Sequence, residues 1–153
     1  MLSSTQPKVN NQVAKASGKE DKQYLSKTKE QMDQMQSLVK EKGLVVVNEH
    51  KSLNDEAVYS GYMTKDKSNK EGWGTQIWPD GGKYEGEWHN NCANGKGKFW
   101  HADGDLYEGH WKNDKANGYG LYQHADGARY LGDWKDDMQH GSGVETWADG
   151  SKY

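Results

Sequence analysis

The chain has 153 residues and a formal net charge of −3, and hydrophobic residues make up 32% of it. That share is well below the roughly 45–50% of an ordinary globular domain, so a thick layered core is not expected. The negative net charge disfavours general affinity for a nucleic-acid backbone, and we expect no nucleic-acid partner. The single cysteine, Cys92, excludes an intramolecular disulfide.

The composition of the chain changes near residue 58. Of 17 aromatic residues, 16 lie in 59–153, as do 17 of the 19 glycines. Residues 1–19 are polar with little to bury, which predicts a disordered tail. No apolar run long enough for a secretion signal or a membrane span occurs, so an intracellular chain is expected.

Residues 20–43 have the pattern of an amphipathic helix. Acidic residues open the segment, lysines close it, and Gly43 supplies a stop signal. Positions three and four apart form one stripe: Leu25, Thr28, Met32, Met35 and Val39. A stripe of this kind needs a partner surface, either in the same chain or on another protein, and the sequence leaves both open. Leu25, Met32, Met35 and Val39 are therefore candidate partner-binding residues.

The next segment, 44–58, is predicted to be a linker. Its β-branched residues from Leu44 to Val47 favour a strand that could pair with the edge of the following domain.

Residues 59–153 contain a repeat. A pentad of the form Tyr-x-Gly-x-Trp occurs three times at intervals of 23 residues, beginning at Tyr84, Tyr107 and Tyr130. Each pentad is followed at constant distances by glycines and by an Asp-Gly pair. An earlier, less regular copy begins at Tyr59. The units are 59–83, 84–106, 107–129 and 130–152, and a fixed period of this length indicates a repeat architecture.

Each unit has the pattern of a β-hairpin. Alternation places Tyr84, Gly86 and Trp88 on one face of a strand. The turn-forming segment "HNNCAN", which includes Cys92, separates it from a second strand, "GKGKFW", and "HADGD" makes the next turn. The predicted fold is therefore all-β: an elongated, single-layer antiparallel meander of hairpins with an N-terminal α-helix.

The glycines predict how this sheet is stabilised. Glycine inside a strand often marks the close approach of another group. Because glycines alternate with Tyr and Trp on one face, we expect each ring to lie over the glycines of a neighbouring strand. The predicted structural core consists of Tyr84, Trp88, Tyr107, Trp111, Tyr130, Trp134, Gly97, Gly120 and Gly143.

The motif Tyr-x-Gly-x-Trp, then Gly-x-Gly, then Asp-Gly resembles the MORN repeat. The resemblance covers about 95 of the 153 residues and implies an elongated, often curved single-layer β-sheet. It also implies a scaffold, as MORN proteins serve at the cytoskeleton, in ciliary axonemes and radial spokes. The alternative implied role is a membrane- or phosphoinositide-associated adaptor, or a regulatory region of a lipid-kinase-like protein.

The polar residues do not predict an enzyme, a metal site or a cofactor. The pairs His101-x-Asp103 and His124-x-Asp126 recur, but equivalent positions lie two strands and so roughly 9–10 Å apart, too far to share one ion. The two histidines occupy the register of Trp78 and Trp147, which indicates a ring in a packing position.

The candidate binding features are two. Trp73, Trp100 and Tyr119 lie on the face opposite Tyr84 and Trp88, where some should be exposed and could contact other proteins. The last strand, 141–147, would be an open edge able to pair with another chain. Lipid binding would need a basic cluster, and the one local concentration, Lys65, Lys67 and Lys70, has acidic neighbours.

Overall fold

The computed structural model describes the backbone of residues 19–153 and the side chains from residue 29 onward. The predicted tail and the side chains of Leu25 and Thr28 lie outside the described residues. The chain divides into two units, Met1–Gln34 and Met35–Tyr153, and the whole sheet lies in the second. The described elements are one helix and nine strands: α1 (Lys19–Lys42), β1 (Val45–Lys51), β2 (Val58–Met63), β3 (Lys70–Ile77), β4 (Lys83–His89), β5 (Cys92–Trp100), β6 (Leu106–Lys112), β7 (Lys115–Gln123), β8 (Arg129–Lys135) and β9 (Met138–Thr146).

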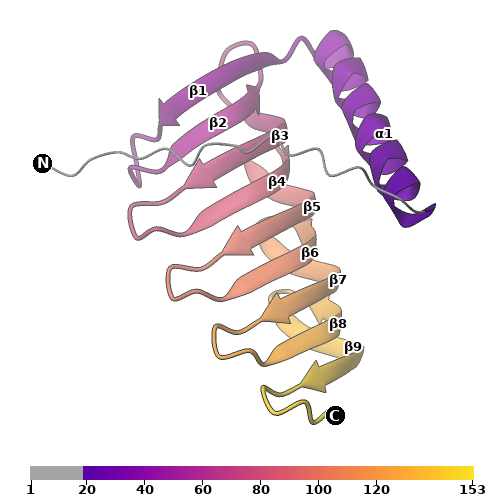
Figure 1. Ribbon diagram of the computed structural model, residues 1–153. Helices are drawn as coiled ribbons and strands as arrows, with labels where there is room; N and C mark the ends of the chain where they lie inside the picture. Colours follow the sequence, from indigo (N-terminus) through magenta and orange to yellow (C-terminus); the bar gives the residue numbers. More distant parts are fainter. Residues whose placement is uncertain (1–18) are drawn as a thin grey trace, which may run out of the picture. The chain divides into compact units, whose positions relative to one another are not determined.

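The strands form one open sheet in chain order, and every neighbouring pair is antiparallel (Figure 1). The predicted meander with a single N-terminal helix is confirmed. Because each strand pairs only with the strands before and after it in the chain, stability comes from contacts between neighbouring hairpins. Strand β1, from the segment between the helix and the repeats, pairs with β2, as in Val45 opposite Met63.

Helix α1 ends at a glycine. Gly43 has a φ of +62°, a left-handed conformation that glycine adopts at little cost. The amide of Leu44 donates to the carbonyl of Val39 at 3.3 Å and so satisfies one carbonyl of the last turn. Lys40 and Lys42 lie in this turn, where the helix dipole favours positive charge.

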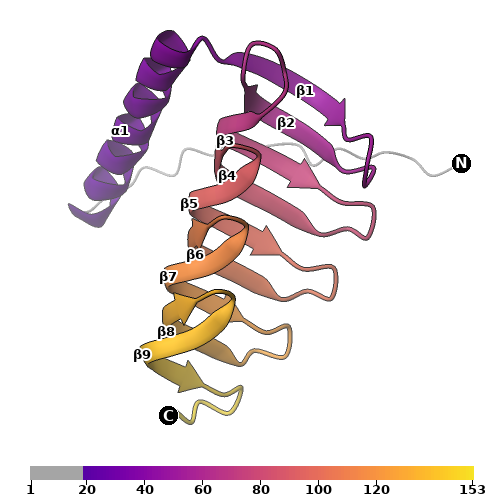
Figure 2. The same cartoon turned by 180° about the vertical axis from the view of Figure 1, so that it is seen from behind.

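The hairpin turns stack in two rows along the sheet. The turns after β3, β5 and β7 form one row, on the left in Figure 1 and on the right in Figure 2. At the opposite ends of the strands, the turns after β4, β6 and β8 have two residues each with positive φ at both positions: Asn90–Asn91, Asn113–Asp114 and Asp136–Asp137. This is the type I′ geometry, whose twist matches that of the flanking strands.

The prediction that Cys92 lies in a hairpin turn is wrong. The turn needs only Asn90 and Asn91, so β5 begins at Cys92, which pairs with His89 of β4. The strand starts three residues earlier than the predicted "GKGKFW" because two Asn residues with positive φ reverse the chain at once.

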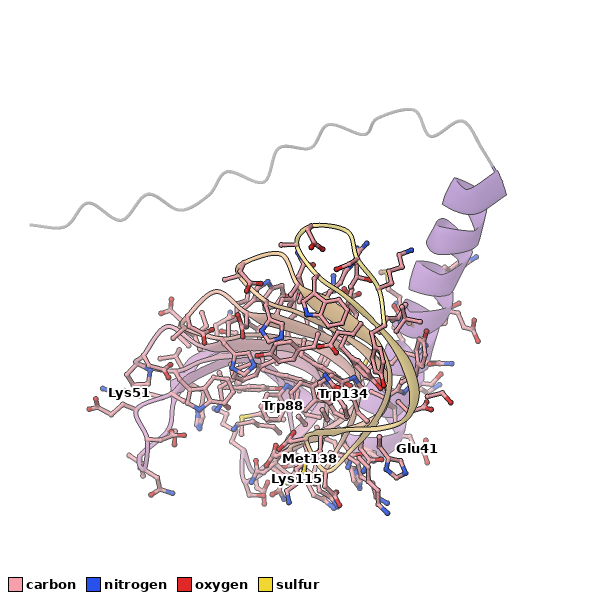
Figure 3. The ribbon with its side chains drawn as sticks, turned by 90° about the horizontal axis from the view of Figure 1, so that it is seen from below. Glu41, Lys51, Trp88, Lys115, Trp134 and Met138 are labelled. Carbon is pink, nitrogen blue, oxygen red and sulfur yellow. The ribbon has the colours of Figure 1, made fainter. Side chains whose placement is uncertain are left out.

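The two faces of the sheet differ. The inner face carries Tyr84 and Trp88 and their equivalents in the other hairpins, and the outer face carries Glu85 and Lys98 and theirs. Viewed end-on, the strands curve around Trp88 and Trp134 (Figure 3). The most deeply buried large side chains, Tyr59 and Tyr84, lie on the inner face at 1% exposure each. The core is thus a single layer of rings lying on the sheet.

Candidate protein-interaction surfaces

The tyrosine that begins each repeat unit covers a glycine of the strand that follows it. The ring of Tyr84 lies against Gly97 and the ring of Tyr107 against Gly120, so closely that a Cβ on either glycine would come within 3.0 Å of ring atoms. The Tyr84 hydroxyl donates to the carbonyl of Glu87 at 2.9 Å, which satisfies the buried polar end of the ring. Tyr59 and Tyr130 repeat this arrangement over Gly74 and Gly143. The tyrosine therefore joins the two strands of its own hairpin.

Each inner-face tryptophan points the other way, onto the preceding hairpin. The indole Nε1 of Trp88 donates to the carbonyl of Gly74 at 3.1 Å. Trp111 and Trp134 make the same bond, at the same length, to the carbonyls of the glycines one hairpin back. The tryptophan therefore joins one hairpin to the hairpin before it.

The rings form one continuous zipper across the hairpins. Three tryptophans, Trp88, Trp111 and Trp134, each meet the tyrosine of their own hairpin and that of the preceding hairpin edge to face, with ring centroids 5.0–5.5 Å apart. Edge-to-face contacts of this kind contribute about 0.5–1.5 kcal/mol each beyond the burial of area. The order along the sheet is Tyr59, Trp88, Tyr84, Trp111, Tyr107, Trp134, Tyr130.

Burial of these tyrosines predicts alkaline unfolding. Burial raises the pKa of Tyr107 from its ordinary 10.0 to about 12, and it raises the pKa of Tyr59 and Tyr84 as well. Below pH 10 both states hold the protons, so the stabilisation is fully present. As the pH rises through 10 toward 12, the unfolded chain loses them first and the free energy of unfolding falls. We expect the ionisation of these tyrosines, followed by absorbance, to coincide with loss of the sheet's circular dichroism; ionisation without unfolding would contradict this.

A second row of rings runs along the rim of the sheet near the Asp-Gly turns. His101 contacts Phe99 edge to face, with centroids 4.5 Å apart, and the ring of His124 contacts that of Tyr122 at a tilt, with centroids 4.8 Å apart. The carboxylate of Asp105 accepts from the hydroxyl of Tyr122 at 2.6 Å. Although both histidines are exposed, each is in contact with an aromatic ring. No group of three or more His, Cys, Asp or Glu is placed to hold a metal ion among the described residues.

Glu71 is the one buried carboxylate of the described sheet, with 8% of its side chain exposed. Its oxygens accept from Lys42 Nζ at 2.8 Å and from the amide of Asn90 at 3.0 Å, and Oε1 lies 2.7 Å from His89 Nδ1. Burial alone would raise the pKa of Glu71, but these hydrogen bonds outweigh it and hold the pKa below its usual range. Glu71 therefore ties the end of α1 to the β4–β5 turn within the second unit.

We expect Glu71→Gln to lower the free energy of unfolding by about 1–2 kcal/mol at neutral pH, because it removes charged hydrogen bonds at a buried position. A carboxylate with a lowered pKa stabilises above its unfolded pKa and loses that effect as pH falls, so the variant's loss should shrink in acid. Urea denaturation at pH 7 and at acidic pH measures both. The matched control is Glu85→Gln, whose exposed pair with Lys83 at 3.5 Å should change stability by less than about 0.5 kcal/mol. Equal losses for the two variants would contradict the role of Glu71.

The three outer-face aromatics are not equivalent. Tyr119 is 55% exposed and Trp73 is 37% exposed. Trp100 is half-buried, and the ammonium of Lys83 lies 4.9 Å from the centre of its ring. Tyr119 is thus the most accessible of these three aromatic residues.

A line of facing residues crosses the outer face from β3 to β9. Its members are Thr75, Glu85, Lys98, Glu108, Leu121, Leu131 and Val144. The first part is polar and of alternating charge, with Lys98 and Glu108 at 3.5 Å. The last part is apolar. The apolar residues of the line are Leu121, Leu131 and Val144, and Tyr119 lies on the same strand and face as Leu121. We call these four residues the outer patch: Tyr119, Leu121, Leu131 and Val144. Leu131 and Val144 are 41% and 49% exposed.

The predicted helical stripe is divided in the structure. Met35 and Val39 are partly buried, and the terminal methyl of Met35 approaches Gly72 of β3 within the second unit. Met32 is 59% exposed. The side chain of Leu25 lies outside the described residues, so its role stays a prediction. No helix in the described range is both long enough and apolar enough to cross a bilayer.

The last strand leaves most of one side open. Lys152 bridges to Thr146, and Tyr153 exchanges two backbone hydrogen bonds of 2.8 Å with Glu145. Strand β9 is otherwise paired with β8 alone. Pairing of this edge with another chain stays a prediction.

Sequence reasoning missed one lateral contact that the two-residue turns provide. The Oδ1 of Asp114 accepts from the amide of Ala93, 21 residues earlier, at 2.7 Å. Asp137 does the same with Ala116 at 2.7 Å, and Asn91 with Lys70 at 2.8 Å. The recurrence of Asn or Asp every 23 residues at this position is the signal that could have revealed it.

The fold and the inner-face zipper define a class of single-layer repeat protein. The family model of the MORN repeat matches four consecutive stretches, 67–83, 84–106, 107–129 and 130–152, which together make up more than half of the chain. The chain therefore belongs to the MORN-repeat family. A search of curated proteins found no match.

Proposed function

We propose that this chain is a non-enzymatic MORN scaffold that holds other proteins together in a cytoskeletal or ciliary complex, of the kind found in axonemes and radial spokes. The setting comes from the roles of other MORN proteins. The outer patch carries the binding role, because four apolar side chains lie together on a face where the rest of the row is polar or charged. A contiguous exposed apolar area rimmed by polar residues is typical of a protein-binding surface.

The sheet suits this role because its stability and its binding face are separate. The zipper that stabilises the hairpins lies on the inner face, and the outer patch contributes little burial. Outer-face residues can therefore contact a partner without loss of the core.

The experiment is affinity capture from ciliated cells with the full chain as bait and mass spectrometry as the readout. The test variant is Leu131→Lys combined with Tyr119→Ser, and the matched control is Glu85→Lys at the charged end of the same line. We expect the test variant to lose at least about tenfold of the captured partner, since a charge in an interface core removes more than about 1.4 kcal/mol. Circular dichroism verifies that both variants keep the sheet.

Unchanged capture by the test variant would contradict the outer patch. Partners unrelated to the cytoskeleton or the cilium would contradict the proposed setting. A bait lacking residues 1–58 separates the contribution of the helix from that of the repeats.

The proposal predicts no salt-sensitive binding to anionic vesicles. In the basic cluster, the ammonium of Lys70 lies 4.7 Å from the centre of the Trp88 ring, and Asp66 is held in the adjoining turn by hydrogen bonds from Ser68 and Thr64. Those bonds hold the pKa of Asp66 near 2, so the carboxylate stays charged beside the lysines. Strong, salt-dependent co-sedimentation with vesicles would favour the lipid-associated alternative.

A further inference from the structure

A second ladder of rings lies on the inner face beside the Asp-Gly turns. Its neighbouring ring centroids are 4.5–5.9 Å apart. His101 and His124 are exposed, and the other three rings are partly exposed. We call this row the rim ladder, and its members are Trp78, Phe99, His101, Tyr122 and His124. In contrast to the buried zipper, the rim ladder is an accessible aromatic surface.

Exposed carboxylates accompany the rim ladder along the row of turns on the left in Figure 1. Asp80, Asp103 and Asp126 occupy the same position in three successive turns, and all three are exposed. Burial, the hydrogen bond to Asp105 and the negative charges of Asp105 and Asp103 raise the pKa of Tyr122. The surroundings of the ladder therefore favour positive charge.

The basic residues that flank these turns point away from the ladder. Alternation along β4 and β8 places Lys83 and Arg129 on the outer face. There the ammonium of Lys83 lies 4.9 Å from the centre of the Trp100 ring and 3.5 Å from a carboxylate oxygen of Glu85. These two residues therefore leave the rim aspartates available to a cationic ligand.

A buried acceptor at the start of the ladder lacks a donor. Gln76 is 4% exposed, and its Oε1 has no hydrogen-bond partner among the residues that the structure describes. Gln76 faces Tyr84 as Phe99 faces Tyr107 in the next hairpin, so it occupies a position that the following unit fills with a ring. Because buried polar atoms are nearly always paired, an N–H group beside Trp78 would satisfy this oxygen.

The repeat sets the spacing of the possible contacts. Trp78, His101 and His124 are equivalent residues of successive units, two strands and so about 9–10 Å apart. A polyproline II segment rises about 3.1 Å per residue and presents every third residue on one side, which gives a spacing of about 9.3 Å. Aromatic-lined surfaces bind such segments. A planar guanidinium can both stack on a ring and donate to a carboxylate.

We propose that the rim ladder binds an extended arginine- and proline-rich segment of a partner protein, with arginine at every third position. The first guanidinium would lie beside Trp78 and donate to Oε1 of Gln76. The next two would lie beside His101 and His124, with the turn aspartates as acceptors. The inference rests on the assembly role proposed above and names a class of partner, on a different surface from the outer patch.

The experiment titrates the full chain with two peptides of identical composition, RPPRPPRPP and PPPRRRPPP. Calorimetry gives the affinity, and two-dimensional amide NMR gives the site. We expect the first peptide to bind at least about fivefold more tightly, because only its arginines match the spacing of the rings. The amide shifts should centre on Ala102, Gly104 and Ala125, which lie in the turns of the rim.

Two rim variants and one control test the contacts. Asp103→Asn combined with Asp126→Asn keeps the oxygen that accepts a backbone amide in each turn and removes two charges. It should weaken the first peptide about tenfold. The matched control, Glu85→Gln with Glu108→Gln, makes the same change in net charge on the outer face and should weaken it less than about twofold. Gln76→Leu removes the unpaired acceptor and should weaken it at least about threefold.

Equal affinity of the two peptides, no binding at millimolar peptide, or unchanged affinity in either rim variant would overturn the proposal. Tighter binding after removal of residues 1–18 would assign the ladder to the chain's own first residues and overturn the choice of partner. The outer-patch variant, Leu131→Lys with Tyr119→Ser, should keep full peptide affinity, so failure of the two proposals can be told apart.

Discussion

Gly120→Ala is expected to lower the free energy of unfolding by about 2–4 kcal/mol, although alanine normally suits a strand better than glycine. The added Cβ would come within 3.0 Å of the Tyr107 hydroxyl and of two of its ring carbons. The Tyr107 ring is wedged between neighbouring tryptophans, so it cannot move away without breaking the zipper. Urea denaturation followed by circular dichroism measures the loss.

The control for this prediction is Gly82→Ala. Gly82 lies before β4, where a Cβ would meet the flexible carboxylate of Asp80 at 3.1 Å and no backbone within that distance. We expect a change of less than about 1 kcal/mol. If the two substitutions cost the same, close contact between ring and glycine is not what makes Gly120 necessary.

Trp88→Ala is expected to cost about 3–5 kcal/mol, the usual loss for a large buried aromatic. Trp88 is 5% exposed, meets both Tyr59 and Tyr84 edge to face, and donates to the carbonyl of Gly74. Because it joins two hairpins, amide exchange should accelerate most in β2–β5 and least in β7–β9.

Two variants separate the parts of the Trp88 effect. Trp88→Phe keeps a ring but removes the indole N–H. The free energy of unfolding should fall by about 1–2 kcal/mol beyond the loss caused by the smaller ring, because the hydrogen bond to Gly74 is lost. Trp147→Ala removes an indole that is 42% exposed in the last turn, and should cost less than about 1 kcal/mol. If amide exchange accelerated equally over the whole sheet in Trp88→Ala, the claim that Trp88 stabilises mainly the two hairpins it contacts would be contradicted.

The sheet could be predicted from the sequence because its local signals agree. The 23-residue period, the two-residue alternation and the Asp-Gly turns all predict hairpins. The alternation of aromatic residues with glycines on one face predicts that the rings pack on the backbone of a neighbouring strand. Alternation could not predict whether a ring covers the following strand or the preceding hairpin. Tyr84 reaches forward to Gly97 whereas Trp88 reaches back to Gly74, and only the side-chain conformations decide which strand each ring covers.

The exposure of the outer-face residues was harder to predict, because it depends on neighbours from other strands. Alternation placed Trp73, Trp100 and Tyr119 on the outer face, but the nearby lysine that covers Trp100 depends on cross-strand register. Register also unites Leu121, Leu131 and Val144, which come from three different strands. The error at Cys92 has a similar origin, since the length of a turn depends on which residues adopt positive φ.

The most direct test of the ring-on-glycine account is a double-mutant cycle between Tyr107→Leu and Gly120→Ala, with stability measured by urea denaturation. If the Tyr107 ring is what excludes a side chain at position 120, Gly120→Ala should cost at least about 1 kcal/mol less in the Tyr107→Leu background than in the unchanged chain. The same cost in both backgrounds would show that glycine is required there for another reason, and would contradict the account.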